Sequence, residues 1–114
     1  MRLLIVFAAC ASLLGCVFGP AQRTEAPKLT EAQSERVEFV GIYKTGNMPG
    51  QPYSEIGAVD AADCFDGKAI DTLKRKTVAL RGDAVIEVSC ASASVQGCQA
   101  ARKCTGKAVR WNER

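Results

Sequence analysis

The cysteines are the residues of this chain whose chemistry is most distinctive. A cysteine thiolate can act as a nucleophile, bind a metal ion or form a disulfide. The sequence has six cysteines and no histidine among its 114 residues. Without an imidazole base, the serines of the chain cannot form a histidine-dependent acyl-transfer triad. The positions of the cysteines divide them into two groups, one at the amino end and one in the rest of the chain.

Cys16 belongs to the first group, because it ends an apolar segment at the amino end. Arg2 is followed by a run over residues 3–14 that is apolar with one exception. This run is shorter than the roughly 20 residues that span a bilayer, and it fits the apolar part of a secretory signal peptide. Residues 13–16 read Leu-Leu-Gly-Cys and resemble the lipobox of bacterial lipoproteins. The resemblance implies cleavage after residue 15, a diacylglycerol on the Cys16 thiol and an acylated amino end.

An ordinary secretory signal is the alternative, with Ala9-Cys10-Ala11 as a weak cleavage site. Lipidation is the better match, because the basic start, the length of the apolar run and the lipobox all agree. Val17 follows the modified cysteine, whereas an aspartate at this position resembles the inner-membrane retention signal of enterobacterial lipoproteins. We therefore expect a protein that acyl chains anchor to the outer membrane on its periplasmic side.

The second group consists of Cys64, Cys90, Cys98 and Cys104. An even number of cysteines in a short exported chain is typical of a disulfide framework. A zinc site of four thiolates and a thioredoxin-like redox site are the alternatives, but the chain has no C-x₂-C pair. We expect two disulfides, and no metal ion or cofactor.

The chain divides into three predicted segments. Residues 1–15 form the lipoprotein signal peptide, and residues 16–36 form a lipid-anchored flexible linker. The linker has two prolines and many small or polar residues, so its composition cannot bury a core. Extended, ~20 residues would reach about 60–70 Å. Residues 37–114 form a disulfide-stapled periplasmic domain.

The domain is predicted to contain elements in the order ββαββ. The predicted strands are Val37–Tyr43, Tyr53–Val59, residues 84–89 and residues 102–111. Gly57 indicates a bulge in the second of them. The order predicts an α+β fold, a small sheet with one helix packed on one face. A core of this size contributes little net stability, so two disulfides are expected to staple it.

The one helix is predicted between the second and third strands. It starts at Asp66 or Gly67, and Gly82 is expected to end it as the residue after the C-cap. Its apolar positions recur at spacings of 3, 4 and 3 residues, which places them on one face. These positions are Ile70, Leu73, Thr77 and Leu80.

The order of the strands predicts the pairing of the four domain cysteines only in part. Cys90 ends the third predicted strand and Cys104 lies in the fourth, so pairing of these strands would place the two side by side. Cys64 and Cys98 then remain, both in loops. A Cys90–Cys98 bond, which closes a tight loop, stays open as an alternative.

Several short motifs accompany these cysteines from about Ile42 to the end of the chain. They are Gly50-Gln51-Pro52-Tyr53, Asp63-Cys64, Asp83-Ala84-Val85-Ile86, Gly97-Cys98 and Lys103-Cys104-Thr105-Gly106. With the basic helix between them, these motifs resemble the outer-membrane stress-sensor lipoproteins of the enterobacterial Rcs phosphorelay, the RcsF-like family. All four domain cysteines have counterparts in that family.

The resemblance implies a lipid anchor, a disordered linker and a small α/β domain with two nonconsecutive disulfides, Cys64–Cys98 and Cys90–Cys104. It also implies a protein that senses envelope damage and is not an enzyme. Its implied partners are an inner-membrane Rcs regulator and outer-membrane barrel proteins.

Two places in the domain are candidates for partner binding. Lys74, Arg75 and Lys76 could dock an acidic partner or lipid head groups, and a solvated helix face is the alternative. Trp111 could anchor a partner, although a lone tryptophan more often covers the edge of a core. Removal of the signal peptide takes Arg2 away and lowers the net charge from +3 to +2. This mild charge predicts no binding to nucleic acid, and no small-molecule substrate is expected.

The features together predict a lipid-anchored envelope-stress sensor that signals through protein–protein contacts to a phosphorelay regulator. The alternative is a structural or scaffolding outer-membrane lipoprotein that has no signalling role. A thiol–disulfide enzyme is a third hypothesis, which the missing C-x-x-C motif disfavours.

Overall fold

The computed structural model describes residues 22–112. The predicted signal peptide and the predicted lipidation site Cys16 lie outside the described residues. Within residues 22–112, no helix is both long enough and apolar enough to cross a membrane.

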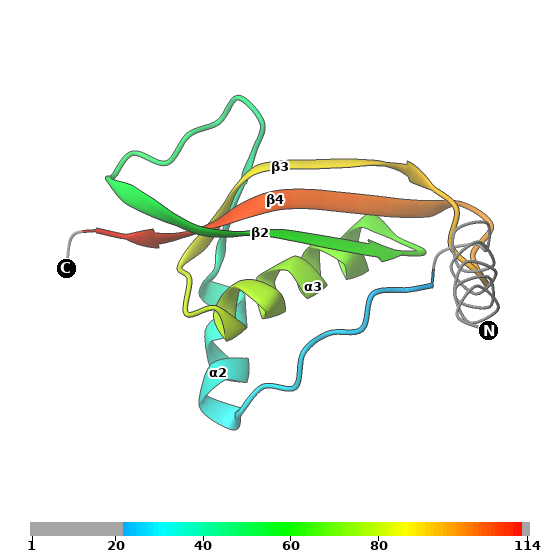
Figure 1. Ribbon diagram of the computed structural model, residues 1–114, viewed down its shortest axis with the longest axis horizontal. Coiled ribbons are helices and arrows are strands. Elements are labelled where there is room, and N and C mark those ends of the chain that lie inside the picture. Colours follow the sequence, from blue (N-terminus) through cyan, green and yellow to red (C-terminus); the bar gives the residue numbers. More distant parts are fainter. Residues whose placement is uncertain (1–21, 113–114) are drawn as a thin grey trace, which may run out of the picture.

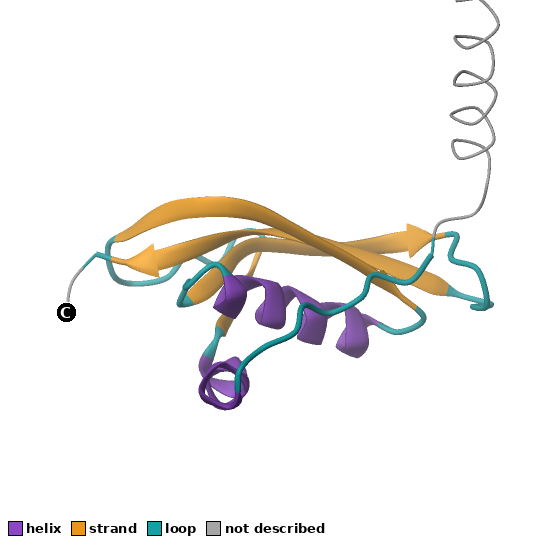
Figure 2. Cartoon of the chain, turned by 60° about the horizontal axis from the view of Figure 1, so that its bottom comes forward, coloured by secondary structure: helices purple, strands orange, loops and turns teal. Residues whose placement is uncertain are grey.

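The described chain forms an α+β fold with four strands in one mixed sheet (Figure 1). Its elements in order are α2 (Glu31–Arg36), the 3₁₀ helix η1 (Val37–Phe39), β1 (Gly41–Lys44), β2 (Tyr53–Asp63), α3 (Asp66–Ala79), β3 (Ala84–Ala93) and β4 (Ala101–Trp111). The strands lie in the order β1-β3-β4-β2, with β1 parallel to β3 and the other neighbours antiparallel. Figure 2 shows α3 lying along one face of this sheet. The predicted ββαββ order and the packing of the helix on the sheet are confirmed.

The main core lies between α3 and the sheet. Leu73 of α3 is fully buried, and it packs in one cluster with Val85 of β3 and Ala108 of β4. Thr77 is also fully buried, and its hydroxyl donates to the Leu73 carbonyl at 2.8 Å, so this polar group is paired. Leu80, the last position of the predicted apolar face, is 43% exposed because it caps the end of the helix.

A second apolar cluster lies on the opposite face of the sheet. Neighbouring strand residues point to opposite faces, and Ile86 belongs to this cluster whereas Val85 belongs to the main core. The aromatic residues Tyr43, Tyr53 and Trp111 pack on this cluster. The sheet therefore buries apolar side chains on both faces near the start of β2 and the end of β4.

The carboxyl end of α3 differs from the prediction. Arg81, not Gly82, adopts the left-handed conformation, with φ at 63°. Position 82 needs glycine for a different reason, because a larger residue would not fit: a Cβ there would lie 2.7 Å from Cγ2 of Thr77. Its N–H donates to the Thr77 carbonyl at 2.8 Å and closes the helix.

The predicted strand boundaries were partly wrong. Val37–Phe39 forms the 3₁₀ helix η1, and β1 has only four residues. β2 continues four residues beyond Val59 to Asp63, because it pairs with β4 along its whole length. The bulge predicted at Gly57 is present as a register shift between Glu55 and Gly57.

Residues 22–36 of the predicted linker contact the domain. The Thr24 N–H donates to the Ala62 carbonyl and the Ala62 N–H donates to Thr24 Oγ1, both at 2.9 Å. Leu29 packs against the main core. A capping box between Thr30 and Gln33 starts α2, a feature that sequence reasoning missed. Figure 1 shows this segment running alongside α3 to α2.

Candidate functional site

Two disulfides join the four domain cysteines. Cys90 and Cys104 are directly opposite partners in β3 and β4, and their sulfurs are bonded. Cys64, just after β2, is bonded to Cys98 in the loop between β3 and β4. Both pairings implied by the resemblance are confirmed, and the Cys90–Cys98 alternative is wrong. The two bonds are interleaved along the chain, so together they tie β2, β3 and β4 to one another.

Asp66, Cys90 and Cys104 are residue types that can bind a metal ion, but their bonding here differs from that of metal ligands. A carboxylate oxygen of Asp66 and the two sulfurs lie within 4.8 Å of one another. The sulfurs are joined in the disulfide and are not thiolates. Oδ1 of Asp66 accepts from Nε of Arg102 at 2.7 Å. These groups form an ion pair beside a disulfide, an arrangement that needs no metal ion to be satisfied.

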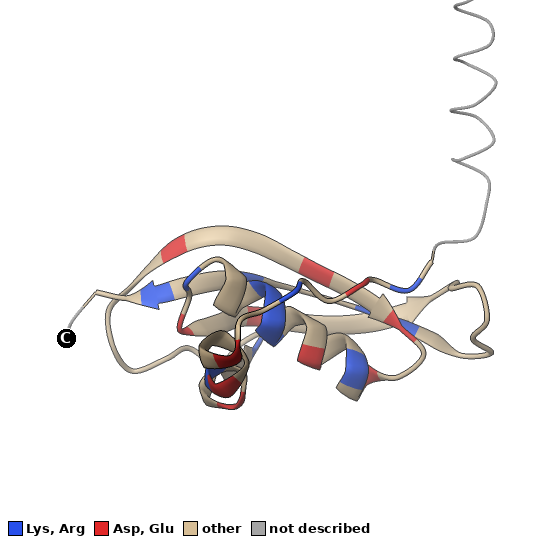
Figure 3. Ribbon diagram, turned by 90° about the horizontal axis from the view of Figure 1, so that it is seen from below, with Lys and Arg blue, Asp and Glu red and all other residues tan. Residues whose placement is uncertain are grey.

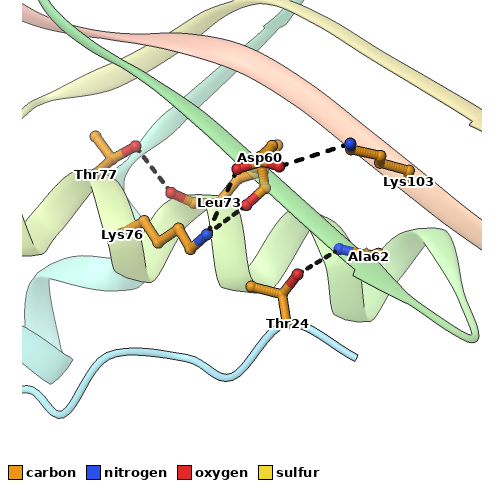
Figure 4. A network of polar contacts seen from close by, with 7 residues as sticks. All are labelled: Thr24, Asp60, Ala62, Leu73, Lys76, Thr77 and Lys103. Atoms are coloured by element: carbon orange, nitrogen blue, oxygen red, sulfur yellow. Dashed lines mark hydrogen bonds and ion pairs between the residues drawn. The ribbon is translucent and has the colours of Figure 1, made fainter. Parts of the chain in front are cut away.

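Two basic residues of α3, Arg75 and Lys76, contact acidic or carbonyl groups of the protein. Arg75 Nε donates to Asp71 at 2.8 Å, one turn earlier on the helix. Lys76 Nζ donates to the Asp60 carbonyl at 2.6 Å and lies 3.8 Å from the Asp60 carboxylate, as drawn in Figure 4. Lys74 is half-buried and lines a cavity of about 440 Å³ between α2 and α3.

Acidic side chains also line this cavity, namely Glu35, Glu38 and Asp71. Figure 3 shows both signs of charge along α3. Lys74, Arg75 and Lys76 therefore do not form an uncompensated cationic surface.

Trp111 lies in the aromatic cluster on the face of the sheet opposite α3. Its ring meets the ring of Tyr43 edge to face, with centroids 6.4 Å apart. The side chain is half-buried, so it both covers the second cluster and keeps an accessible surface. The structure does not bring Trp111 together with the basic residues of α3.

A surface that sequence reasoning missed includes Trp111, and we call it the Phe39 patch. It consists of Arg36, Phe39, Asp83 and Trp111, which line a shallow cavity of about 180 Å³ together with Val40 and Gly82. Phe39 is 78% exposed, the largest value among the exposed large hydrophobic residues of the described chain. Phe39 is presented to solvent because η1 turns Val37, two residues earlier, into the core.

Asp83 contacts two other residues of the Phe39 patch through its carboxylate. Its carboxylate accepts a hydrogen bond from the main-chain N–H of Trp111 at 2.8 Å and lies 3.6 Å from Nη2 of Arg36. The side chain of Asp83 is only 9% exposed, so this carboxylate is largely removed from water. Aromatic residues and arginine dominate the binding energy of protein interfaces. The patch thus has the residue types and the hollow that a partner side chain needs for docking.

The patch was missed because no sequence signal separates an exposed phenylalanine in a predicted strand from a buried one. Phe39 falls in an apolar run with Val37 and Val40, and both valines are buried. This segment was predicted as part of a strand, and it forms a 3₁₀ turn instead.

Comparison with known proteins gives a similarity of fold only. No family model matches the chain, and no curated protein matches its sequence. The structure is similar to a crystal structure of a protein of unknown function from Pediococcus pentosaceus, which belongs to the DUF74 family. The TM-score is 0.53 at 17% sequence identity, and the similarity covers 64% of this chain and 98% of that one. A shared fold at this identity does not carry a function.

Proposed function

We propose that this chain is a lipid-anchored sensor of envelope stress that signals by binding protein partners. The observation that carries the proposal is the interleaved pair of disulfides, Cys64–Cys98 and Cys90–Cys104. This is the pairing that the resemblance to the Rcs stress-sensor lipoproteins implies. Disulfides of this kind persist in oxidising compartments such as the periplasm, which also agrees with an exported chain.

The anchor in this proposal is Cys16, with the domain on the periplasmic side of the outer membrane. The resemblance suggests an inner-membrane Rcs regulator and outer-membrane barrel proteins as the partners. The proposed role is not enzymatic, because a relay by contact needs a surface and no catalytic group. The Phe39 patch supports this role, since it joins an exposed aromatic ring to an ion pair in which the Asp83 carboxylate is largely removed from water and the Arg36 side chain is exposed.

A reporter assay tests the proposal in cells. The gene is deleted, and the output of the phosphorelay is measured after outer-membrane damage. We expect the response to disappear and to return with the wild-type gene. An unchanged response after deletion would contradict the signalling role, and co-purification with a barrel protein would then favour the scaffolding alternative.

The Phe39→Ala variant tests the patch in the same assay. Loss of a hot-spot aromatic residue costs about 2 kcal/mol or more of binding free energy, which weakens the contact by more than about tenfold. We expect a weaker response at the same protein level in the membrane. Met48→Ala is the matched control, because Met48 is also a large exposed residue (57%) but does not line the patch. Equal responses from the two variants would remove the patch from the proposal.

A further inference from the structure

Thr24 fixes the point at which the chain joins the domain. Its N–H and its Oγ1 both bond to the main chain of Ala62, near the end of β2, and Figure 4 shows the contact that involves the hydroxyl. Ala62 is 8% exposed and Thr24 is half-buried, so these bonds are partly sheltered from water. The chain beyond Thr24 stays attached through the packing of Leu29 and the capped helix α2. The free part of the tether therefore ends at residue 23.

This contact shortens the distance that the domain can move away from its proposed anchor. From Cys16 to Thr24 there are eight residue steps, which span at most about 28 Å when fully extended. Without the contact, a tether from Cys16 to Arg36 would span about 70 Å. The end of the domain next to Thr24 is therefore held close to the membrane that carries the acyl chains.

The end of the domain next to Thr24 has groups that suit a lipid surface. Phe65, which precedes α3, is 64% exposed. It lines a cavity of about 430 Å³ with Arg23, the Cys64–Cys98 disulfide and the loop residues Gly97, Gln99 and Ala100. Within residues 22–112, no carboxylate forms an ion pair with the Arg23 guanidinium.

We infer that this Phe65 end of the domain lies on the phospholipid surface, where Phe65 enters the interface and Arg23 binds a lipid phosphate. Guanidinium groups bind phosphate through two parallel hydrogen bonds, and an aromatic ring gains free energy by leaving water for the acyl boundary. The inference rests on the proposed lipid anchor. It orients the molecule, because the Phe39 patch then points away from the membrane.

The orientation follows from the length of β2. Tyr53 at its start pairs with Trp111, and Asp63 at its end pairs with Arg102. An 11-residue strand is about 33 Å long. Trp111 and the Phe39 patch therefore lie roughly 30 Å from the Phe65 end, on the side that a partner outside this membrane can reach.

Fluorescence quenching tests this orientation with the full lipidated protein. The protein is reconstituted into vesicles of phosphatidylethanolamine and phosphatidylglycerol in which part of the lipid carries bromine on its acyl chains. Trp111 is the single tryptophan of the chain, so the wild-type protein serves as the control. We expect no quenching of Trp111, and at least a twofold loss of emission for Phe65→Trp in a Trp111→Phe background. Quenching of Trp111, or none for Phe65→Trp, would overturn the inference.

Thr24→Val tests the cause of the orientation, because it removes the hydroxyl that accepts from the Ala62 N–H. Combined with Phe65→Trp, it is expected to reduce the quenching by half or more. Thr45→Val, at an exposed threonine after β1, is the matched control and should leave quenching unchanged. Quenching that is the same in both variants would contradict the role of Thr24.

Flotation of the same samples separates this inference from the proposed anchor. Acyl chains on Cys16 are sufficient for the protein to float with the vesicles. A protein that floats without quenching of the Phe65→Trp indole overturns the inference and leaves the proposed function intact. A protein that does not float contradicts both.

Discussion

Gly106 of β4 lies so close to residues of β3 that a side chain has no room there. A Cβ at this position would lie 2.5 Å from Cγ1 of Val85 and 3.1 Å from the Ile86 carbonyl oxygen. Both neighbours are fully buried, so neither can move aside. We expect Gly106→Ala to lower the free energy of unfolding by about 1–3 kcal/mol, measured by urea denaturation.

Gly50→Ala is the control for this substitution. No atom lies within 4 Å of a Cβ built at Gly50, which is exposed in the loop before β2. Its denaturation midpoint should stay at the wild-type value or rise slightly, because alanine restricts the unfolded chain. Equal midpoints for Gly50→Ala and Gly106→Ala would show that the close approach at Gly106 does not exist.

At the scale of single elements, helix α2 extends the folded unit into the predicted linker. This six-residue helix buries none of its residues, so its stability depends on the Thr30–Gln33 capping box and its chain neighbours. Thr30→Ala removes a cap worth about 0.5–2 kcal/mol. We expect faster amide hydrogen exchange confined to residues 31–36.

Thr45→Ala is the matched variant for this measurement, because it removes an exposed threonine outside the helix. Its exchange over α2 should equal that of the wild type. If Thr30→Ala leaves exchange in α2 unchanged as well, the capping box does not hold this helix.

Whether an element could be predicted from the sequence depended on whether its residues follow a periodic pattern. The spacing of 3, 4 and 3 residues between Ile70, Leu73, Thr77 and Leu80 predicted α3, because this pattern matches the period of a helix. The turn at Val37–Phe39 and the docking of Thr24 had no such period. They depend on contacts with residues far along the chain, such as Ala62, which the local sequence does not encode.

At the scale of the whole molecule, the disulfides decide whether so small a domain stays folded. The pairs are separated by 34 and 14 residues along the chain. On the chain-entropy model their loss costs just under 4 and about 3 kcal/mol. A net stability of roughly 5–15 kcal/mol is usual for proteins, so the loss of both bonds removes about half of it or more.

We expect Cys64→Ala/Cys98→Ala and Cys90→Ala/Cys104→Ala each to fold with reduced stability. The variant that combines all four substitutions should lack ordered structure at 37 °C by circular dichroism and by amide exchange. A cooperative, wild-type-like unfolding transition in that variant would show that the core alone is sufficient.

The pairing could be assigned before the structure only through the resemblance, since strand order alone left Cys90–Cys98 open. The candidate site was less predictable than the fold. Trp111 is part of the Phe39 patch, but Arg75 and Lys76 of α3 are paired with Asp71 and Asp60. Whether a charge is compensated depends on tertiary neighbours, which a run of lysine and arginine does not reveal.

The most direct test of the account is intact-mass analysis and non-reducing peptide mapping of the protein purified from its own membrane. We predict an amino end at Cys16 that carries a diacylglycerol and an acyl chain, with cross-linked peptides for Cys64–Cys98 and Cys90–Cys104. An unmodified amino end, four free thiols or any other pairing would contradict it.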